Sequence, residues 1–203
     1  TYAREVIPYW HGRTQRERIF GHVPDEWRRA YEAGLFTEFM EQRAPGHTAL
    51  DGKIYRKGML DYKREIAEHL ASLDYLNDPE ATDKAEEWKA MDISCDAVIV
   101  FAERHAALAE EMAVGESDPT RKAELLKIAE VCRWVPANAP RTFWEAIQMY
   151  WFVHLAIITE LNGWDAMNPG HFDQHLAPFY EREITAGTLT REQAKELLSC
   201  FWI

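Results

Sequence analysis

The sequence predicts a mainly α-helical protein. Helix-start signals recur along the chain: an Asp N-cap precedes Pro at 78–79 and again at 118–119, and capping boxes join Thr142 to Glu145 and Thr190 to Gln193. Apolar residues follow these signals at helical spacing, whereas convincing strands are scarce and no internal repeat is present.

The expected helices follow one another through short connections. Residues 2–23 mix arginines with apolar residues at helical spacing and are interrupted at Pro8 and Gly12. Further helices are expected at 24–33, 59–73, 78–114 with a break near 93–94, 119–134, 142–161 and from 190 onward. Periodicity is weak at 36–58, where we expect loops and a short strand near 53–56, and 162–171 form a turn-rich loop.

The helix at 142–161 is expected to be among the most buried elements. Its apolar residues occupy every face, which a helix on the surface would not tolerate. Polar residues interrupt this stretch at Glu145, Gln148, His154 and Glu160. It therefore predicts a buried helix rather than a membrane span.

Charge and cysteine content exclude several classes of partner. The formal net charge of −11 argues against nucleic acid and anionic membranes, because both require a cationic face. The three cysteines, Cys95, Cys132 and Cys200, are far apart and form no CxxC pair. They predict neither a disulfide framework nor a zinc site, so we expect the protein to act in the reducing environment of the cytoplasm. No signal peptide opens the chain.

Both ends of the sequence indicate an internal segment of a longer chain. Thr1 is not an initiator Met, and residues 197–203 stop within an apolar helical pattern that has no cap. We therefore expect the natural chain to extend in both directions.

An ordered set of motifs marks residues 140–180. These are PRTFWEAIQ at 140–148, WFVHL at 151–155, ELNG at 160–163, NPGHFDQ at 168–174 and PFY at 178–180. In this order they closely resemble the pyruvate formate-lyase-like domain of glycyl radical enzymes. Earlier segments fit the same domain: IPYW at 7–10, GRT at 12–14, PGHT at 45–48, CDA at 95–97, FAERHA at 101–106, RKAEL at 121–125 and VPA at 135–137. The chain departs from many relatives at His171, where Arg is common, and at His175, where Tyr is common.

The resemblance implies that residues 1–203 form a helical fragment of a pyruvate formate-lyase-type, ten-stranded α/β barrel wrapped in helices. In the family, a radical cysteine lies in a Gly-Cys-Val-Glu type motif, and a glycyl radical lies in a C-terminal Arg-Val-x-Gly-Tyr type loop. Neither motif occurs in these 203 residues. We therefore expect an internal part of the domain without the radical-cysteine loop and the glycyl radical domain. The three cysteines present are expected to pack within helices.

The resemblance also implies the activity of the full-length protein. The glycyl radical would take a hydrogen atom from the cysteine thiol, and the thiyl radical would take one from a small-molecule substrate. A Glu two residues after that cysteine would act as base while a C–S, C–N, C–O or C–C bond breaks. An S-adenosylmethionine-dependent iron–sulfur activating enzyme would install the radical, and the full-length lyase would be a cytoplasmic homodimer that is sensitive to oxygen.

The subfamily expected from the resemblance is isethionate sulfite-lyase. The reasons are the loop at 162–171 and Arg43 just before the PGHT loop. Arylacetate decarboxylases and diol, choline or hydroxyproline eliminases are the alternatives within the family. A free-standing helical binding module, without enzymatic activity, is the alternative outside it.

Three residues are expected to bind the substrate. In relatives the PGHT loop approaches the substrate, so Arg43 and His47 are candidates; the guanidinium of Arg43 suits a carboxylate or sulfonate. The alternative is a solvated Arg beside a loop-bracing His. Asn168 is the third candidate, and its alternative is an Asx-turn bond.

Other clusters of polar residues predict no chemistry. His171 and His175 have the spacing of a metal pair but no third ligand, so no metal is expected. Glu103, His105 and Glu110 lie on several faces of a long charged helix and are expected to face solvent.

Overall fold

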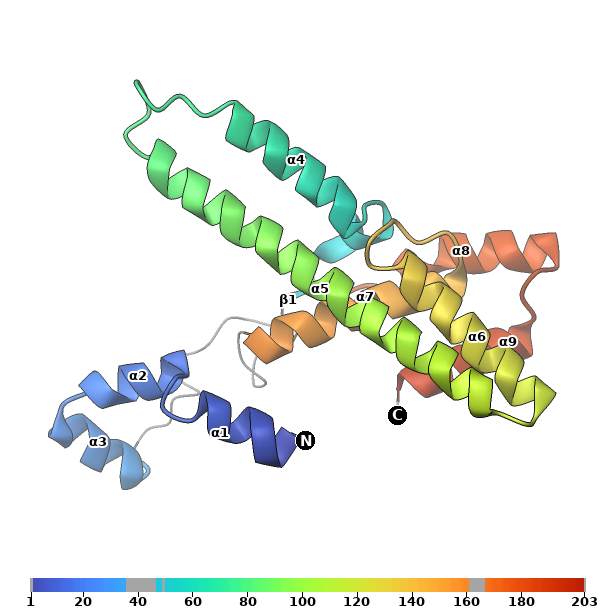
Figure 1. Ribbon diagram of the computed structural model, residues 1–203, viewed down its shortest axis with the longest axis horizontal. Coiled ribbons are helices and arrows are strands. Elements are labelled where there is room, and N and C mark those ends of the chain that lie inside the picture. Colours follow the sequence, from blue (N-terminus) through green and yellow to red (C-terminus); the bar gives the residue numbers. More distant parts are fainter. Residues whose placement is uncertain (1, 36–46, 49, 161–166, 203) are drawn as a thin grey trace. The chain divides into compact units, whose positions relative to one another are not determined.

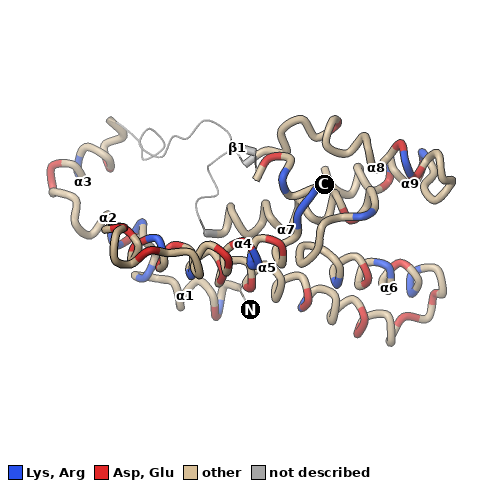
Figure 2. The backbone as a smooth tube through the Cα atoms, turned by 90° about the horizontal axis from the view of Figure 1, so that it is seen from above, with Lys and Arg blue, Asp and Glu red and all other residues tan. Residues whose placement is uncertain are grey.

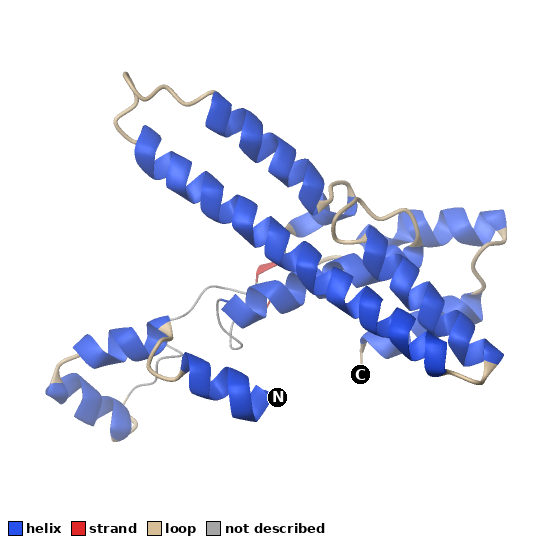
Figure 3. Cartoon of the chain, in the orientation of Figure 1, coloured by secondary structure: helices blue, strands red, loops and turns tan. Residues whose placement is uncertain are grey.

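The computed structural model describes residues 2–35, 47–48, 50–160 and 167–202, and most of these are helical, as predicted (Figures 1 and 3). The chain divides into two compact units, Thr1–Pro45 and Gly46–Ile203. No helix among the described residues combines the length and apolarity needed to cross a membrane.

The first unit contains a π-helical turn η1 (Tyr2–Val6), α1 (Ile7–Trp10), α2 (Gln15–His22) and α3 (Asp25–Glu32). Helix α2 begins at a capping box, in which the hydroxyl of Thr14 accepts from the Glu17 amide at 3.1 Å. Phe20 packs edge-to-face against Trp27 and Tyr31. Within this unit the break expected at Gly12 is confirmed, because Gly12 has a φ of 72° between α1 and α2.

In the second unit, α4 (Met59–Ala71) and α6 (Pro119–Trp134) both pack along the long helix α5 (Ala81–Gly115) (Figure 1). Asp118 caps α6 as predicted, accepting from the Thr120 amide at 2.9 Å. Basic and acidic residues are interspersed along α6 (Figure 2). Glu110 of α5 pairs with Arg133 of α6 at 2.8 Å, in agreement with the solvated surface expected there.

The break expected near 93–94 is wrong, because α5 continues through 35 residues. The hydroxyl of Ser94 donates to the carbonyl of Ala90 at 2.9 Å, so this polar side chain is satisfied inside the helix. Small residues also let α5 approach α6 closely. Ala102, Ala106 and Ala109 pack there against Ala129 and Cys132.

Helix α7 (Phe143–Glu160) supplies much of the core, which confirms the predicted burial of this segment. Its fully or largely buried residues are Phe143, Glu145, Ala146, Ile147, Met149, Tyr150, Phe152 and Val153. Trp151 is 39% exposed and faces a cavity described below. Helices α8 (Phe172–Ala186) and α9 (Arg191–Phe201) pack against α7.

The beginning of α7 is held by a buried carboxylate. Glu145 is 1% exposed and accepts from the Arg141 backbone amide and guanidinium, each at 2.6 Å. The hydroxyl of Thr142 accepts from the Glu145 amide at 3.1 Å, so the Thr half of the predicted capping box forms. The glutamate half differs, because its carboxylate binds Arg141 rather than the Thr142 amide. The Arg141 guanidinium also lies 3.7 Å from the Trp134 ring centroid.

The short strand predicted at 53–56 is wrong. That segment is a 3-10 helix, η3 (Asp51–Tyr55), in which Ile54 and Tyr55 are buried. Ile54 and Tyr55 are adjacent apolar residues of types that are common in strands. Left-handed backbone at Leu50 (φ 54°) and Asp51 (φ 51°) nevertheless turns the chain before it can extend. The strand pair lies elsewhere: β1 (His47–Thr48) pairs in parallel with β2 (Met167–Asn168).

Candidate functional site

The β1–β2 pair brings together two of the three predicted substrate-binding residues. His47 is opposite Met167, and Thr48 is opposite Asn168. Residues 47–48 and 167–168 therefore lie side by side, although they are far apart in the sequence. Arg43, the third candidate, lies outside the described residues.

Asn168 forms the Asx turn considered as its alternative role. Its side-chain oxygen accepts from the Gly170 amide at 2.9 Å, and Gly170 adopts a φ of 62°. This bond fixes the turn that joins β2 to α8. The side-chain nitrogen of Asn168 forms no hydrogen bond with the residues that the structure describes, so it can still donate one.

The elements that follow the two strands, η3 after β1 and α8 after β2, contact each other at His175. This residue lies in α8, and its ring stacks on Tyr55 of η3 with centroids 5.0 Å apart. Burial raises the pKa of the Tyr55 hydroxyl well above its ordinary value, and the hydroxyl has no hydrogen-bond partner among the residues that the structure describes. The sequence marked His175 as a departure from many relatives and as half of a metal pair, but it gave no indication of this packing contact. Among the described residues, no group of three or more His, Cys, Asp and Glu could hold a metal ion.

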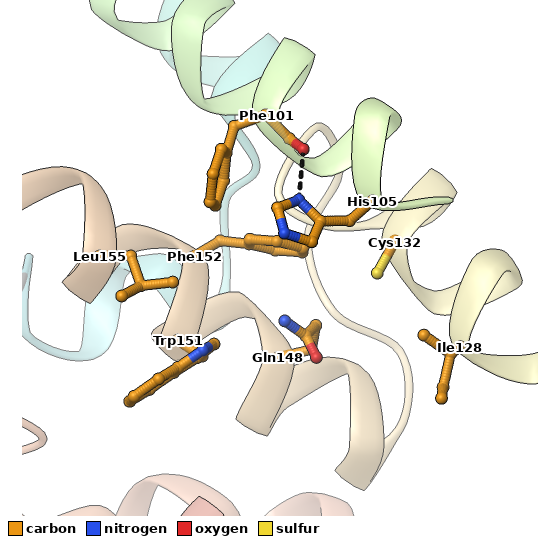
Figure 4. A pocket seen from close by; sticks show the side chains of 8 residues that line it. All are labelled: Phe101, His105, Ile128, Cys132, Gln148, Trp151, Phe152 and Leu155. Atoms are coloured by element: carbon orange, nitrogen blue, oxygen red, sulfur yellow. Dashed lines mark hydrogen bonds between the residues drawn. The ribbon is translucent and has the colours of Figure 1, made fainter. Parts of the chain in front are cut away.

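A cavity lies between α5, α6 and α7 (Figure 4). It encloses about 210 Å³ and is lined by Phe101, His105, Ile128, Cys132, Gln148, Trp151, Phe152 and Leu155. The His105 ring bonds through Nδ1 to the carbonyl of Phe101 at 2.8 Å. Burial raises the pKa of the Cys132 thiol to about 11, so the thiol is neutral at pH 7 and is not an activated nucleophile. This cavity is suited to packing rather than to catalysis.

The other two cysteines also differ from a catalytic group. Cys95 is buried in α5, where burial raises its pKa. Packing within a helix, the role expected for all three, is confirmed for Cys95 and Cys132. Cys200 lies in α9 but is exposed, so the expectation of packing is wrong for that residue.

Comparison with known proteins identifies the family. The model of the family described as "Pyruvate formate lyase-like" matches residues 1–203. The chain belongs to this family. Members similar to it include trans-4-hydroxy-L-proline dehydratase of Clostridioides difficile, which is 52% identical over 202 residues. That alignment covers 100% of this chain and 26% of the dehydratase.

A solved structure and a second relative complete the comparison. The crystal structure of hydroxyproline dehydratase from Clostridioides difficile, with trans-4-hydroxy-L-proline bound, matches with a TM-score of 0.85. The match covers 99% of this chain and 26% of that one. Isethionate sulfite-lyase of Nitratidesulfovibrio vulgaris is 36% identical, over 99% of this chain and 25% of its own length.

These matches confirm the predicted family and the predicted helical fragment of its fold. The chain spans about a quarter of the length of these relatives. The expectation of the isethionate sulfite-lyase branch is not confirmed, because the dehydratase is more similar by 52% against 36% identity.

Proposed function

We propose that the full-length protein is a glycyl radical dehydratase that removes water from trans-4-hydroxy-L-proline. The 52% identity to a dehydratase of this substrate, over the whole chain, is the main support. That alignment spans 202 positions, whereas the sulfite-lyase alignment spans 210 and must contain gaps, since the chain has 203 residues. Loss of water breaks a C–O bond, one of the four bond types expected from the sequence.

Arg43, His47 and Asn168 are proposed to bind this substrate. Trans-4-hydroxy-L-proline carries a carboxylate, which the guanidinium of Arg43 can bind through paired hydrogen bonds. His47 and Asn168 would contribute further hydrogen bonds. The parallel pairing of β1 with β2 supports a site shared by these two segments.

The remaining requirements of the reaction lie outside these residues. The glycyl radical would be installed in the full-length protein by an S-adenosylmethionine-dependent iron–sulfur activating enzyme. The protein would act in the cytoplasm as a homodimer. We prefer this function to a helical binding module because the similar proteins named above are enzymes.

A substrate panel tests the proposed function. The full-length protein, activated without oxygen, is given trans-4-hydroxy-L-proline, isethionate or glycerol, and products are followed by mass spectrometry with a separate sulfite assay. We expect kcat/KM for hydroxyproline dehydration to exceed the other two by about 100-fold or more, because a site that hydrogen-bonds one substrate discriminates strongly against others. If kcat/KM for sulfite release from isethionate exceeded kcat/KM for hydroxyproline dehydration, the protein would instead be assigned as an isethionate sulfite-lyase.

The polypeptide 1–203 alone is expected to be inactive, because it contains neither radical-bearing motif. It is incubated without oxygen with the activating enzyme and S-adenosylmethionine, and spin-resonance spectra and products are recorded. We expect no glycyl-type doublet and no product. A doublet from these 203 residues would contradict this account.

A further inference from the structure

His175 joins the two segments that leave the β1–β2 pair. The strands are parallel, so both leave the pair at the same edge. The chain after β1 turns through Leu50 into η3, and the chain after β2 turns through Asn168 into α8. His175 lies in the first turns of α8 and contacts η3. Because each strand has only two residues, few ladder hydrogen bonds can hold the pair.

The contact between His175 and η3 is made mainly by the face and edge of its ring. The imidazole stacks on Tyr55 at an interplanar angle of 24°. It also covers Gly52 so closely that a Cβ added there would lie 3.1 Å from its Cε1 atom. A side chain at residue 52 would therefore require the ring to shift by a few tenths of an ångström.

The charge of His175 contributes much less. Its Nε2 lies 3.7 Å from Oδ1 of Asp51, which is too long for a hydrogen bond. The Asp51 side chain is 73% exposed, so water weakens the pairing. The Arg56 guanidinium also lies near Gly52, at 3.5 Å from the same added Cβ. The contacts between His175 and η3 are therefore made mainly by packing of the ring.

The turn held in this way is conformationally unfavourable. Leu50 and Asp51 both adopt left-handed backbone, which Asp tolerates but Leu rarely adopts. Such backbone persists only where surrounding contacts fix it, and it clusters at functional sites. Leu50 itself is 43% exposed, so its own side chain provides little of this support.

We propose that His175 is a positioning residue for the candidate substrate site. By packing on Tyr55 and Gly52 it holds η3 against α8 and so fixes where β1 lies beside β2. This role rests on the proposed function in so far as the β1–β2 segments bind substrate. The residue itself does not touch the reacting atoms.

Four variants of the full-length enzyme test the role. His175→Ala removes the ring, and Gly52→Ala forces the ring to shift by a few tenths of an ångström. His175→Phe keeps a ring of similar shape without the imidazole nitrogens. His69→Ala is the matched control, because the exposed His69 ring also stacks on an aromatic side chain, that of Trp88, but contacts neither strand nor η3.

Kinetics with trans-4-hydroxy-L-proline separate positioning from a loss of folded enzyme. Displacing a substrate-binding segment raises KM, whereas a smaller folded fraction lowers kcat at an unchanged KM. We expect His175→Ala and Gly52→Ala to raise KM by about 10-fold or more, and His175→Phe and His69→Ala to stay near the parent. An unchanged KM in His175→Ala, or a Phe variant as impaired as the Ala variant, would overturn the proposal.

Hydrogen exchange of the full-length protein, without activation or substrate, gives a readout that does not depend on the reaction. The η3 amides are expected to exchange faster in His175→Ala and Gly52→Ala than in the parent, and at parental rates in His175→Phe. If the parent does not dehydrate hydroxyproline but exchange follows this pattern, only the proposed function fails. If exchange at η3 is the same in all variants, the positioning role of His175 is wrong.

Discussion

Gly58→Ala is expected to lower the free energy of opening α4 by about 3 kcal/mol or more. A Cβ at this position would lie 2.3 Å from both the Ala137 carbonyl oxygen and the Asn138 Cα, which are backbone atoms that cannot rotate away. The two segments are also joined by two backbone hydrogen bonds: the Met59 amide donates to the Pro136 carbonyl at 2.8 Å, and the Leu60 amide donates to the Ala137 carbonyl at 3.0 Å. Native-state hydrogen exchange of the α4 amides in the full-length protein measures this free energy.

Gly115→Ala is the matched control for that substitution. Gly115 is the last residue of α5, and an added Cβ there meets no atom within 4 Å. Because alanine favours the helix, the control is expected to be neutral or to stabilise by about 0.5 kcal/mol. If the two glycine variants shifted α4 exchange equally, the close approach at Gly58 would not be a determinant of stability.

Arg43→Gln in the full-length enzyme is expected to cost about 2–5 kcal/mol in kcat/KM for hydroxyproline. A pocket that excludes water to protect a radical also removes water from its ligand, so an unpaired carboxylate is costly there. Removing one partner of a buried ion pair carries a cost of this size. Steady-state kinetics of the activated enzyme measure it.

Arg13→Gln is the control for Arg43. Arg13 is exposed and lies 4.4 Å from the Tyr9 ring, so its loss is expected to change kcat/KM little. Arg182 is also exposed but donates to the Arg141 carbonyl, which makes it a less neutral control. Near-normal kinetics for Arg43→Gln would remove the assignment of Arg43 to the carboxylate.

The helices were predictable because their signals are local. Asp118 and Thr190 each bond to an amide two or three residues further along, so the sequence alone contains both partners. The burial of α7 was predictable for a related reason, since apolar residues on every face leave no solvated side. The unbroken course of α5 was missed because one Ser beside Ile93 resembles a break but is satisfied within the helix.

The strand pair and the contacts behind it were not predictable by such signals. His47 and Asn168 were chosen from the resemblance to relatives, and no local pattern places Thr48 beside Asn168. The role of His175 depends on Gly52 and Tyr55, which only tertiary structure brings to it. The close approach of His175 to Gly52 leaves no periodic pattern in the sequence. The spacing of His171 and His175 alone could suggest only a metal pair.

A crystal structure of the full-length protein with trans-4-hydroxy-L-proline bound tests the central claim most directly. We predict that the ligand contacts residues of the β1 and β2 segments, with atoms of Arg43, His47 or Asn168 within about 4 Å of it. The apolar cavity beside Phe101 and Trp151 should not contain it. A ligand bound in that cavity, or at any place where none of the three candidates contacts it, would contradict the account.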